Sequence, residues 1–395
     1  MKKLVLVSLA VLVTVVSYGQ SSLEKKMADT KAKMTASFNA NQKNLQGQKS
    51  SYEASQQRLK EKYEAYCNRL MSMWGDKTMV ESTKKEWVEY TNNDESRSIV
   101  DFENGDVTVE VLVDAGASED TVNEKLELAV GELLESKGTT PVYDIDTEAK
   151  DETPKPEPVY ETPILENQLD LTKFTSSTKT EKIAEAIVEE KPKQVKTVDT
   201  DSGQKQVVSI RLQLVEDHIP KRAEGFKQFI AKHSSTHNID QPLVYAVIEQ
   251  ESAFNPMARS SAGAYGLMQI VPVSGGRDAN VYVNNRDVTP KPQELYDPDF
   301  NIQLGVGYLK KQMKVYFKGI RDLKSSMLCA IAAYNTGQGN VYYALTGKRS
   351  SSGVAEKVNS MSYDQLYEYL KEHLPHAETR DYIQKVTSKM EKYTE

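Results

Sequence analysis

The chain has 395 residues, which is enough for two domains with cores of their own and additional tails. Apolar residues make up 38% of it and charged residues 27%, a balance that indicates folded domains joined to polar sequence. The formal net charge is −7 and no basic block occurs, so the composition argues against a nucleic-acid-binding protein.

The first residues have the pattern of an export signal. Lys2 and Lys3 precede an apolar run over residues 4–16, and small residues then lead to an expected cleavage before Gln20. The run is shorter than the roughly 20 apolar residues that a membrane-spanning helix needs, although a retained membrane anchor is the alternative. We therefore predict a signal peptide over residues 1–19 and an exported protein of the periplasm or cell envelope. No cysteine follows the run, so no lipid anchor is expected there.

Residues 20–66 are polar and contain no proline. Larger side chains recur there every seven residues, at Phe38, Leu45, Tyr52, Leu59 and Tyr66. The second apolar position of each heptad is mostly polar, and a single stripe does not make a stable coiled coil. We predict a polar helical spacer.

A β-hairpin is expected after the spacer. Residues 98–102 and 106–113 flank the turn sequence Glu103-Asn104-Gly105, and Asn-Gly is a strong hairpin signal. Valines alternate along the second strand, which predicts that one of its faces is buried; they are Val107, Val109, Val111 and Val113.

The hairpin belongs to a predicted small α+β domain over residues 67–215. Residues 119–136 carry apolar side chains at helical spacing, and the alternating run 206–214 predicts a strand that returns to this domain. The intervening segment 148–163 is rich in proline and acidic residues, which predicts a loop.

Residues 216–395 form a second predicted domain that is mainly α. Its size is ordinary for one domain. The expected helices lie at about residues 226–230, 243–251, 302–316, 326–334, 363–373 and 380–393.

Cysteine and histidine usage predicts no metal site and no cofactor. Cys67 and Cys329 fall in different predicted domains, and the apolar surroundings of Cys329 favour core packing. His233 and His237 are four residues apart, but a polar helix end explains such a pair more often than a metal does.

One glutamate is singled out by helical phase. A suitable N-cap, Asp240, begins a helix in which Leu243, Val247 and Glu251 share one face, and Pro256 limits the helix beyond Glu251. A carboxylate on an inward face is costly to ionise unless it borders a cleft. Glu251 is therefore a candidate general acid, with a buried structural ion pair as the alternative.

Other polar residues nearby are interpreted as structural. Glu249 lies on another face of the same helix and is expected to be a solvated surface acid. Asp297 and Asn301 stand where a later helix needs capping groups.

Three sequence blocks carry a family resemblance. Residues 251–272 read ESAFNPMARSSAGAYGLMQIVP, which resembles the soluble lytic transglycosylase (SLT) signature ES-x-x-NP-x-A-x-S…GA-x-GLMQ-x-x-P. The blocks AAYNTG at residues 332–337 and ETRDYI at residues 378–383 match in the expected order. Together they span most of the predicted second domain.

The resemblance narrows to one subgroup. Gly276-Arg277-Asp278, Met73-Trp74-Gly75, the sequence WVEYT at residues 87–91 and the hairpin resemble the membrane-bound lytic murein transglycosylase C subgroup. Members of that subgroup typically carry a lipid-anchoring cysteine after the signal, and this chain departs from them there.

The resemblance implies a lysozyme-like catalytic domain with Glu251 as the single catalytic acid/base. It also implies a group of residues that line the sugar cleft, namely Ser260, Met268, Gln269, Tyr334, Asn335 and Glu378, with Ser252 and Tyr382 as weaker candidates. The implied reaction is non-hydrolytic cleavage of the β-1,4 bond between N-acetylmuramic acid and N-acetylglucosamine in peptidoglycan, which leaves 1,6-anhydromuramoyl ends. A hydrolase that uses water and a non-catalytic glycan-binding protein remain alternatives. The N-terminal domain is a candidate for binding glycan or other cell-wall proteins.

Overall fold

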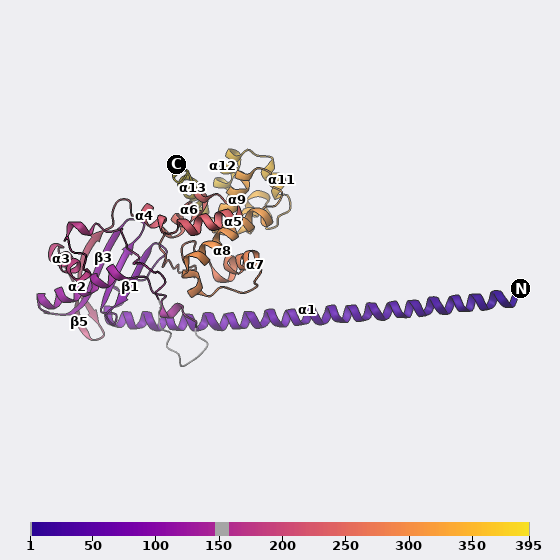
Figure 1. Cartoon of the computed structure of the whole chain (residues 1–395), viewed down its shortest axis with the longest axis horizontal. Helices are drawn as coiled ribbons and strands as arrows, with labels where there is room; N and C mark the ends of the chain where they lie inside the picture. Colours follow the sequence, from indigo (N-terminus) through magenta and orange to yellow (C-terminus); the bar gives the residue numbers. More distant parts are fainter. Residues whose placement is uncertain (1, 147–157, 395) are drawn as a thin grey trace. The chain divides into compact units, whose positions relative to one another are not determined.

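The structure is a computed structural model that describes residues 2–146 and 158–394 (Figure 1). Within the first helix only the backbone is described for residues 2–28, 38, 40–45, 48 and 49. Most of the predicted loop 148–163 lies outside the described residues. The chain divides into two compact units, Met1–Glu61 and Lys62–Glu395.

A single helix, α1, spans Lys2–Trp74. The helix predicted for residues 20–66 is therefore present, and it continues to Trp74. The predicted signal peptide falls on residues whose side chains are not described, and it stays a prediction. No helix in the described part of the chain is long and apolar enough to span a membrane.

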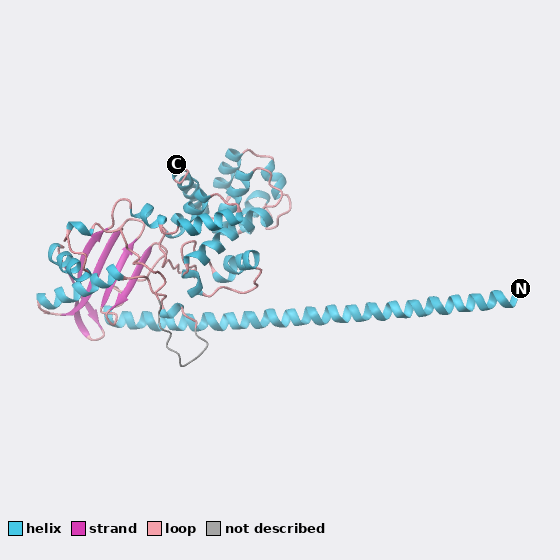
Figure 2. Ribbon diagram, viewed as in Figure 1, coloured by secondary structure: helices cyan, strands magenta, loops and turns pink. Residues whose placement is uncertain are grey.

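Five antiparallel strands form one sheet in the second unit (Figure 2). Their order across the sheet is β1 (Glu86–Thr91), β2 (Ser96–Asp101), β3 (Asp106–Asp114), β5 (Gly203–Gln213) and β4 (Gln194–Thr200). The predicted hairpin is confirmed, with Val100 opposite Val107. The predicted returning strand is also confirmed, because β5 pairs with β3 along its length.

The two faces of the sheet pack against different helices. The valine face of β3 is buried under α2 (Glu119–Glu135), on which α3 (Thr180–Glu190) packs. On the other face, Leu70 and Trp74 of α1 contact Leu112 and Val207. The Trp74 indole N–H donates to the Asp94 carbonyl oxygen at 2.7 Å, which fixes the end of α1 against the sheet.

The helical domain follows the sheet and contains ten α-helices in the described residues. They are α4 (His218–Glu224), α5 (Lys227–His237), α6 (Gln241–Ser252), α7 (Arg277–Asn284), α8 (Pro298–Lys311), α9 (Leu323–Thr336), α10 (Gln338–Thr346), α11 (Val354–Asn359), α12 (Tyr363–His373) and α13 (Ala377–Lys392). Helix α6 packs against α5 and α13 and is buried along most of its length. The predicted α+β class, with a mainly α second domain, is confirmed.

The prediction for Glu249 is wrong. Its side chain is buried, with 5% of the residue exposed. Lys389 and the Tyr393 hydroxyl each donate to its carboxylate at 2.5 Å, and Lys392 donates at 3.1 Å. Helix α13, far away in sequence, covers the face of α6 that a single helix would expose to water.

Replacing Glu249 with Gln is expected to lower the free energy of unfolding at neutral pH by about 2 kcal/mol, as for loss of charge-assisted hydrogen bonds. Burial alone would raise the pKa of Glu249, but the hydrogen bonds from Lys389 and Tyr393 outweigh it and hold the pKa below its ordinary value. A lowered pKa stabilises the fold above the unfolded-state pKa, and this contribution is lost as pH falls through the folded-state value. Urea unfolding of both proteins from pH 7 to pH 3 should show the difference shrinking in acid; a difference independent of pH would contradict this account.

Two polar clusters join the sheet domain to the helical domain. Arg222 of α4 donates to the Phe102 carbonyl oxygen at 2.8 Å and to the Ala253 carbonyl oxygen at 2.8 and 3.1 Å, and it also bonds the side chain of Gln168. These bonds connect the β2–β3 turn to the residue that ends α6.

The second cluster is centred on Asp144, which is 1% exposed. Asp144 ends a short 3-10 turn, Val142–Asp144. Its carboxylate accepts hydrogen bonds from the hydroxyls of Tyr296 at 2.8 Å and Tyr265 at 3.4 Å, and it pairs with Arg259 at 3.3 Å. These partners belong to the helical domain, and two of them lie in the segment 251–272.

Candidate active site

Glu251 lies in the last turn of α6. Asp240 occupies the N-cap position as predicted, although its side chain makes no capping hydrogen bond. Leu243 and Val247 are fully buried on the same face, and Glu251 is 8% exposed. The helix stops at Ser252, since the next residue, Ala253, has a left-handed backbone with φ of 51°. The carboxyl group therefore stands at the inner end of a buried helix.

Burial raises the pKa of Glu251 above its ordinary value. The negative charge of Glu378 acts in the same direction, whereas the Tyr382 hydroxyl and the charges of Lys84 and Lys85 oppose it. The net pKa is raised, so Glu251 holds its proton at a pH where an exposed glutamate is ionised. Such a group can act as a general acid.

Ser252 connects α6 to the loop that follows. Its hydroxyl donates to the carbonyl oxygens of Leu267 at 2.8 Å and Ile248 at 3.1 Å, and the side chain is fully buried. Ser252 thus fixes the loop over the end of the helix and has no exposed group for a ligand.

Asn301 holds the same loop from α8, and the prediction that it caps a helix is wrong. Its amide nitrogen donates to the carbonyl oxygens of Tyr265 and Leu295 at 2.9 and 2.7 Å, and its amide oxygen accepts from the Met268 N–H at 2.8 Å. Asp297 is the N-cap of α8, as predicted, and accepts from the Phe300 N–H at 2.7 Å.

Gly266 is required where the loop meets α8. Its φ is 71°, and a Cβ atom there would lie 2.2 Å from the Leu295 carbonyl oxygen and 2.4 Å from the Asn301 side chain. A larger residue would push apart the loop and the helix. The glycine of the sequence block is therefore explained by a close backbone approach.

A cavity of about 760 Å³ lies beside this loop. Gln269, Tyr334 and Asn335 line it, together with Tyr308 and Tyr316. Glu251 does not line it, although its charge adds to the effect of burial in raising the pKa of Tyr334, which does.

The three predicted residues in this cavity differ in how they are held. The Tyr334 hydroxyl donates to the Met268 carbonyl oxygen at 2.8 Å, and Asn335 accepts from the Thr379 hydroxyl at 2.7 Å. Gln269 donates to the Gly266 carbonyl oxygen at 3.0 Å, while its buried amide oxygen has no partner among the described residues. That oxygen is a buried acceptor that no donor in the described ranges satisfies.

Three other predicted residues do not line this cavity. Met268 is fully buried, with its sulfur packed where a side chain on Gly305 would stand, so it offers no surface to a sugar. The Ser260 hydroxyl accepts from the Ala264 N–H at 3.0 Å within a turn. Glu378 is exposed in the first turn of α13 and reaches Glu251 only through its charge.

Tyr382 is buried in α13, the helix that packs against α6. It is 4% exposed, and its hydroxyl interacts with the Glu251 carboxyl, which lowers the pKa of Glu251 and raises that of Tyr382. The buried hydroxyl makes no hydrogen bond of standard geometry with any residue in the described ranges.

Sequence reasoning missed Lys84 and Lys85, whose charges act on Glu251. Both precede β1, in the other domain, and the Asn255 side chain donates to the Lys84 carbonyl oxygen at 3.4 Å. No motif or spacing could have found them, since their place at the site depends on how two domains pack.

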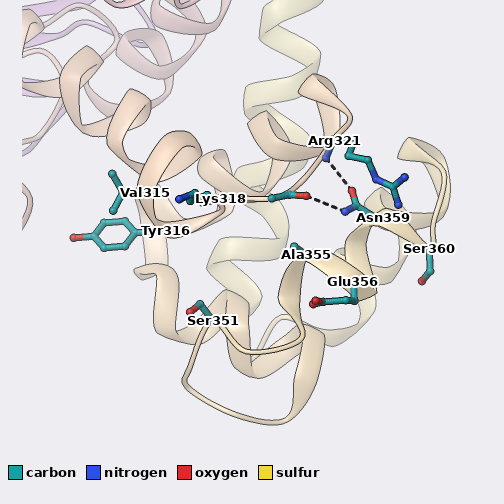
Figure 3. A pocket seen from close by; sticks show the side chains of 10 residues that line it. Val315, Tyr316, Lys318, Arg321, Ser351, Ala355, Glu356, Asn359 and Ser360 are labelled. Carbon is teal, nitrogen blue, oxygen red and sulfur yellow. Dashed lines mark hydrogen bonds between the residues drawn. The ribbon is translucent and has the colours of Figure 1, made fainter.

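A second cavity, also of about 760 Å³, lies between residues 315–321 and 351–360 (Figure 3). Its wall is fixed by Asn359, which accepts from the Arg321 N–H and donates to the Gly319 carbonyl oxygen, both at 2.9 Å. None of the predicted site residues lines it. Within the described ranges, no group of three or more histidine, cysteine, aspartate or glutamate side chains is arranged to hold a metal ion.

Comparisons with known proteins cover both domains. Residues 228–354 match the family model of the transglycosylase SLT domain, and residues 52–225 match that of the membrane-bound lytic murein transglycosylase C N-terminal domain. The soluble lytic transglycosylase of Escherichia coli is a 70 kDa protein of known structure. It is 28% identical to this chain over a match that spans 42% of this chain and 24% of the Escherichia coli protein, with a TM-score of 0.33.

Two relatives align with most of the sequence. The membrane-bound lytic murein transglycosylase C of Sodalis glossinidius is 30% identical over 328 residues, which are 83% of this chain and 88% of the relative. The membrane-bound lytic murein transglycosylase C of Edwardsiella ictaluri is 28% identical over 329 residues, which are 83% of this chain and 87% of the relative. The matches run through both domains in the same order, and the chain belongs to the membrane-bound lytic murein transglycosylase C family.

Proposed function

We propose that Glu251 is the single acid and base with which this lytic transglycosylase cleaves peptidoglycan. The bond cleaved is the β-1,4 linkage between N-acetylmuramic acid and N-acetylglucosamine. The observation that carries the proposal is a buried carboxyl group with a raised pKa at the end of α6, whose charge also acts on Tyr334 in the wall of the cavity. Family membership supports the reaction type.

Protonated Glu251 donates its proton to the glycosidic oxygen as the bond to C1 of the muramoyl residue breaks. The acetamido oxygen of the substrate stabilises the oxocarbenium-like centre, so no second carboxylate is needed. Glu251, now ionised, takes the proton of the muramoyl C6 hydroxyl, and O6 closes on C1. The 1,6-anhydro ring forms without consuming water, and Glu251 regains its proton.

The neighbours of Glu251 suit this change of charge. Glu378 favours the protonated form that begins the reaction, and Tyr382 favours the carboxylate that follows proton donation. Gln269 and Asn335 present amide groups at the cavity wall, which suit sugar hydroxyl and N-acetyl groups. We propose that Ser260 and Met268 support the walls of the cleft from behind. Ser252 fixes the loop after α6, and Tyr334 forms part of the cleft wall.

The protein acts in the cell envelope, where its substrate lies. We propose that residues 1–19 direct export to the periplasm, that residues 20–66 act as a spacer, and that 67–215 and 216–395 are the two domains. The sheet and the helical bundle support this division. The N-terminal domain is proposed to contact other cell-wall proteins in addition to the glycan, and no cofactor is required by the chemistry.

Mass spectrometry of the soluble products tests the reaction. Purified protein incubated with peptidoglycan should release fragments with 1,6-anhydromuramoyl ends, about 18 Da lighter than the products of hydrolysis because no water is added. Reducing ends would instead indicate a lysozyme-like hydrolase. Binding of glycan without release of fragments would indicate a non-catalytic binding protein.

A further inference from the structure

The Gly-Arg-Asp block of the sequence contributes to one wall of the first cavity, which is the cavity beside the loop that follows α6. Arg277 forms a bidentate pair with Asp287, with N–O distances of 2.7 and 3.0 Å. Asp278 accepts hydrogen bonds from Lys311 of α8 at 2.5 Å and from the Tyr316 hydroxyl. The residues of these two groups that line the cavity are Arg277, Asp278, Asp287 and Tyr316. None of them takes part in the proposed reaction, so the block serves the cavity in another way.

Tyr316 is held by both its side chain and its backbone. Its hydroxyl donates to the Asp278 carboxylate, and its carbonyl oxygen accepts from the Tyr342 hydroxyl of α10 at 2.7 Å. The residue is nevertheless partly exposed. A ring that is already fixed, and whose polar group is already bonded, offers apolar surface to a ligand at a small cost in conformational entropy. The C–H face of a pyranose ring is a ligand of this kind.

Tyr316 also stands where two cavities meet. Among the described residues, it is the one that lines both the first cavity and the second, each of about 760 Å³. Its ring lies at the edge of the second cavity, and its hydroxyl points away from that cavity (Figure 3). The preceding residue, Val315, is 49% exposed and lines the second cavity. A polymer that lies in the first cavity therefore has a path over the Tyr316 ring into the second.

The wall of the second cavity suits a chain of sugars. The Ser360 hydroxyl donates to the Lys357 carbonyl oxygen at 2.7 Å, so its oxygen remains an acceptor. Other short side chains leave the space open, namely Ser351 and Ala355. The charged residues of the wall are exposed and of both signs, namely Lys318, Arg321 and Glu356, so the wall as a whole selects neither an anion nor a cation.

We propose that the second cavity binds the continuation of the glycan strand, with Tyr316 as a stacking platform between the two cavities. The inference rests on the proposed function, which supplies a polymeric substrate. It extends that function to strand length, because only a fragment long enough to pass Tyr316 gains the contacts of the second cavity. Long strands should therefore bind more tightly than short fragments.

Binding of glycan fragments of two lengths tests this inference. Calorimetry would use the full chain with Glu251→Gln, so that the substrate is not consumed, and the same chain with a substitution at Tyr316 added. The ligands are stem-free peptidoglycan fragments of two disaccharide units and fragments of at least twice that length. The ratio of the two Kd values should favour the long fragments, and Tyr316→Ala should reduce this ratio about tenfold, as for loss of one aromatic contact.

Two further variants separate stacking from general damage. Tyr316→Phe keeps the ring and should retain most of the preference for long fragments. Tyr343→Ala removes another tyrosine, which is 50% exposed and lines neither cavity, and should leave the preference unchanged. Equal affinity of the Glu251→Gln chain for both lengths, or equal weakening of both by Tyr316→Ala, would overturn the inference. Failure of the proposed function would be seen separately, in the products that the wild-type protein releases.

Discussion

Replacing Glu251 with Gln is expected to lower kcat on peptidoglycan on the order of a thousandfold, with glycan binding little changed. The substitution removes the proton that the leaving oxygen must receive, and the shape of the site is kept. Steady-state release of soluble fragments gives kcat, and binding to insoluble peptidoglycan gives the affinity. Wild-type activity should also fall as pH rises through the raised pKa of Glu251, because the acid form is then lost.

Glu249→Gln is the matched control, with the same chemical change two residues earlier on the same helix. Glu249 pairs with Lys389 and Lys392, at the other end of α13 from Glu378 and Tyr382, so this variant should be less stable and still active at moderate temperature. If Glu251→Gln and Glu249→Gln lost activity equally, the loss would reflect damage to α6 and the assignment of the catalytic acid would be rejected.

Replacing Arg222 with Met is expected to lower the free energy of unfolding by about 3 kcal/mol, since buried acceptors on both domains would lose their donor. Arg222 is 5% exposed, and burial lowers the pKa of its guanidinium to about 9. It also stacks on the Phe102 ring, with 4.4 Å from the guanidinium carbon to the ring centroid. Guanidinium chloride unfolding monitored by tryptophan fluorescence measures the change.

Lys221→Met removes a neighbouring cation whose only ion pair in the described structure, with Asp217, is exposed to solvent. Exposed pairs of this kind contribute little, so this variant should stay within about 0.5 kcal/mol of the wild type. Equal stability of the two variants would show that the Arg222 cluster does not hold the domains together.

The regular elements with clear periodicity could be predicted from the sequence. The alternating valines of β3 and the helical phase of α2 and α6 depend on local pattern, and the structure confirms them. Strand β4 was missed because it is an edge strand with only Val198 buried, so it lacks alternation. Helix α3 was overlooked, although Ile183 and Ile187 show helical spacing.

Only those features of the site that depend on a single helix or a single sequence block could be predicted from the sequence. The inward position of Glu251 follows from the phase of one helix, and the sequence blocks point to its surroundings. The environment of Glu249 and the role of Asn301 depend on α13 and on the 265–268 loop, which no local pattern relates to them. The position of the Lys84 backbone depends on how the two domains pack together, and no local sequence pattern predicts that packing.

The Arg222 cluster has a consequence for how such proteins can be recombined. The two family matches meet between residues 225 and 228, so Arg222 belongs by sequence to the first module. Its hydrogen bonds nevertheless end on Ala253, inside the second. In a chimera joined at residue 226, Arg222 would keep its bonds only if the main chain of the new catalytic module presents the carbonyl oxygen of residue 253 in the same place, and a first module without the arginine would leave that oxygen without its donor. Exchange of catalytic modules between relatives should therefore succeed only when the segment around Arg222 is exchanged together with the segment around Ala253.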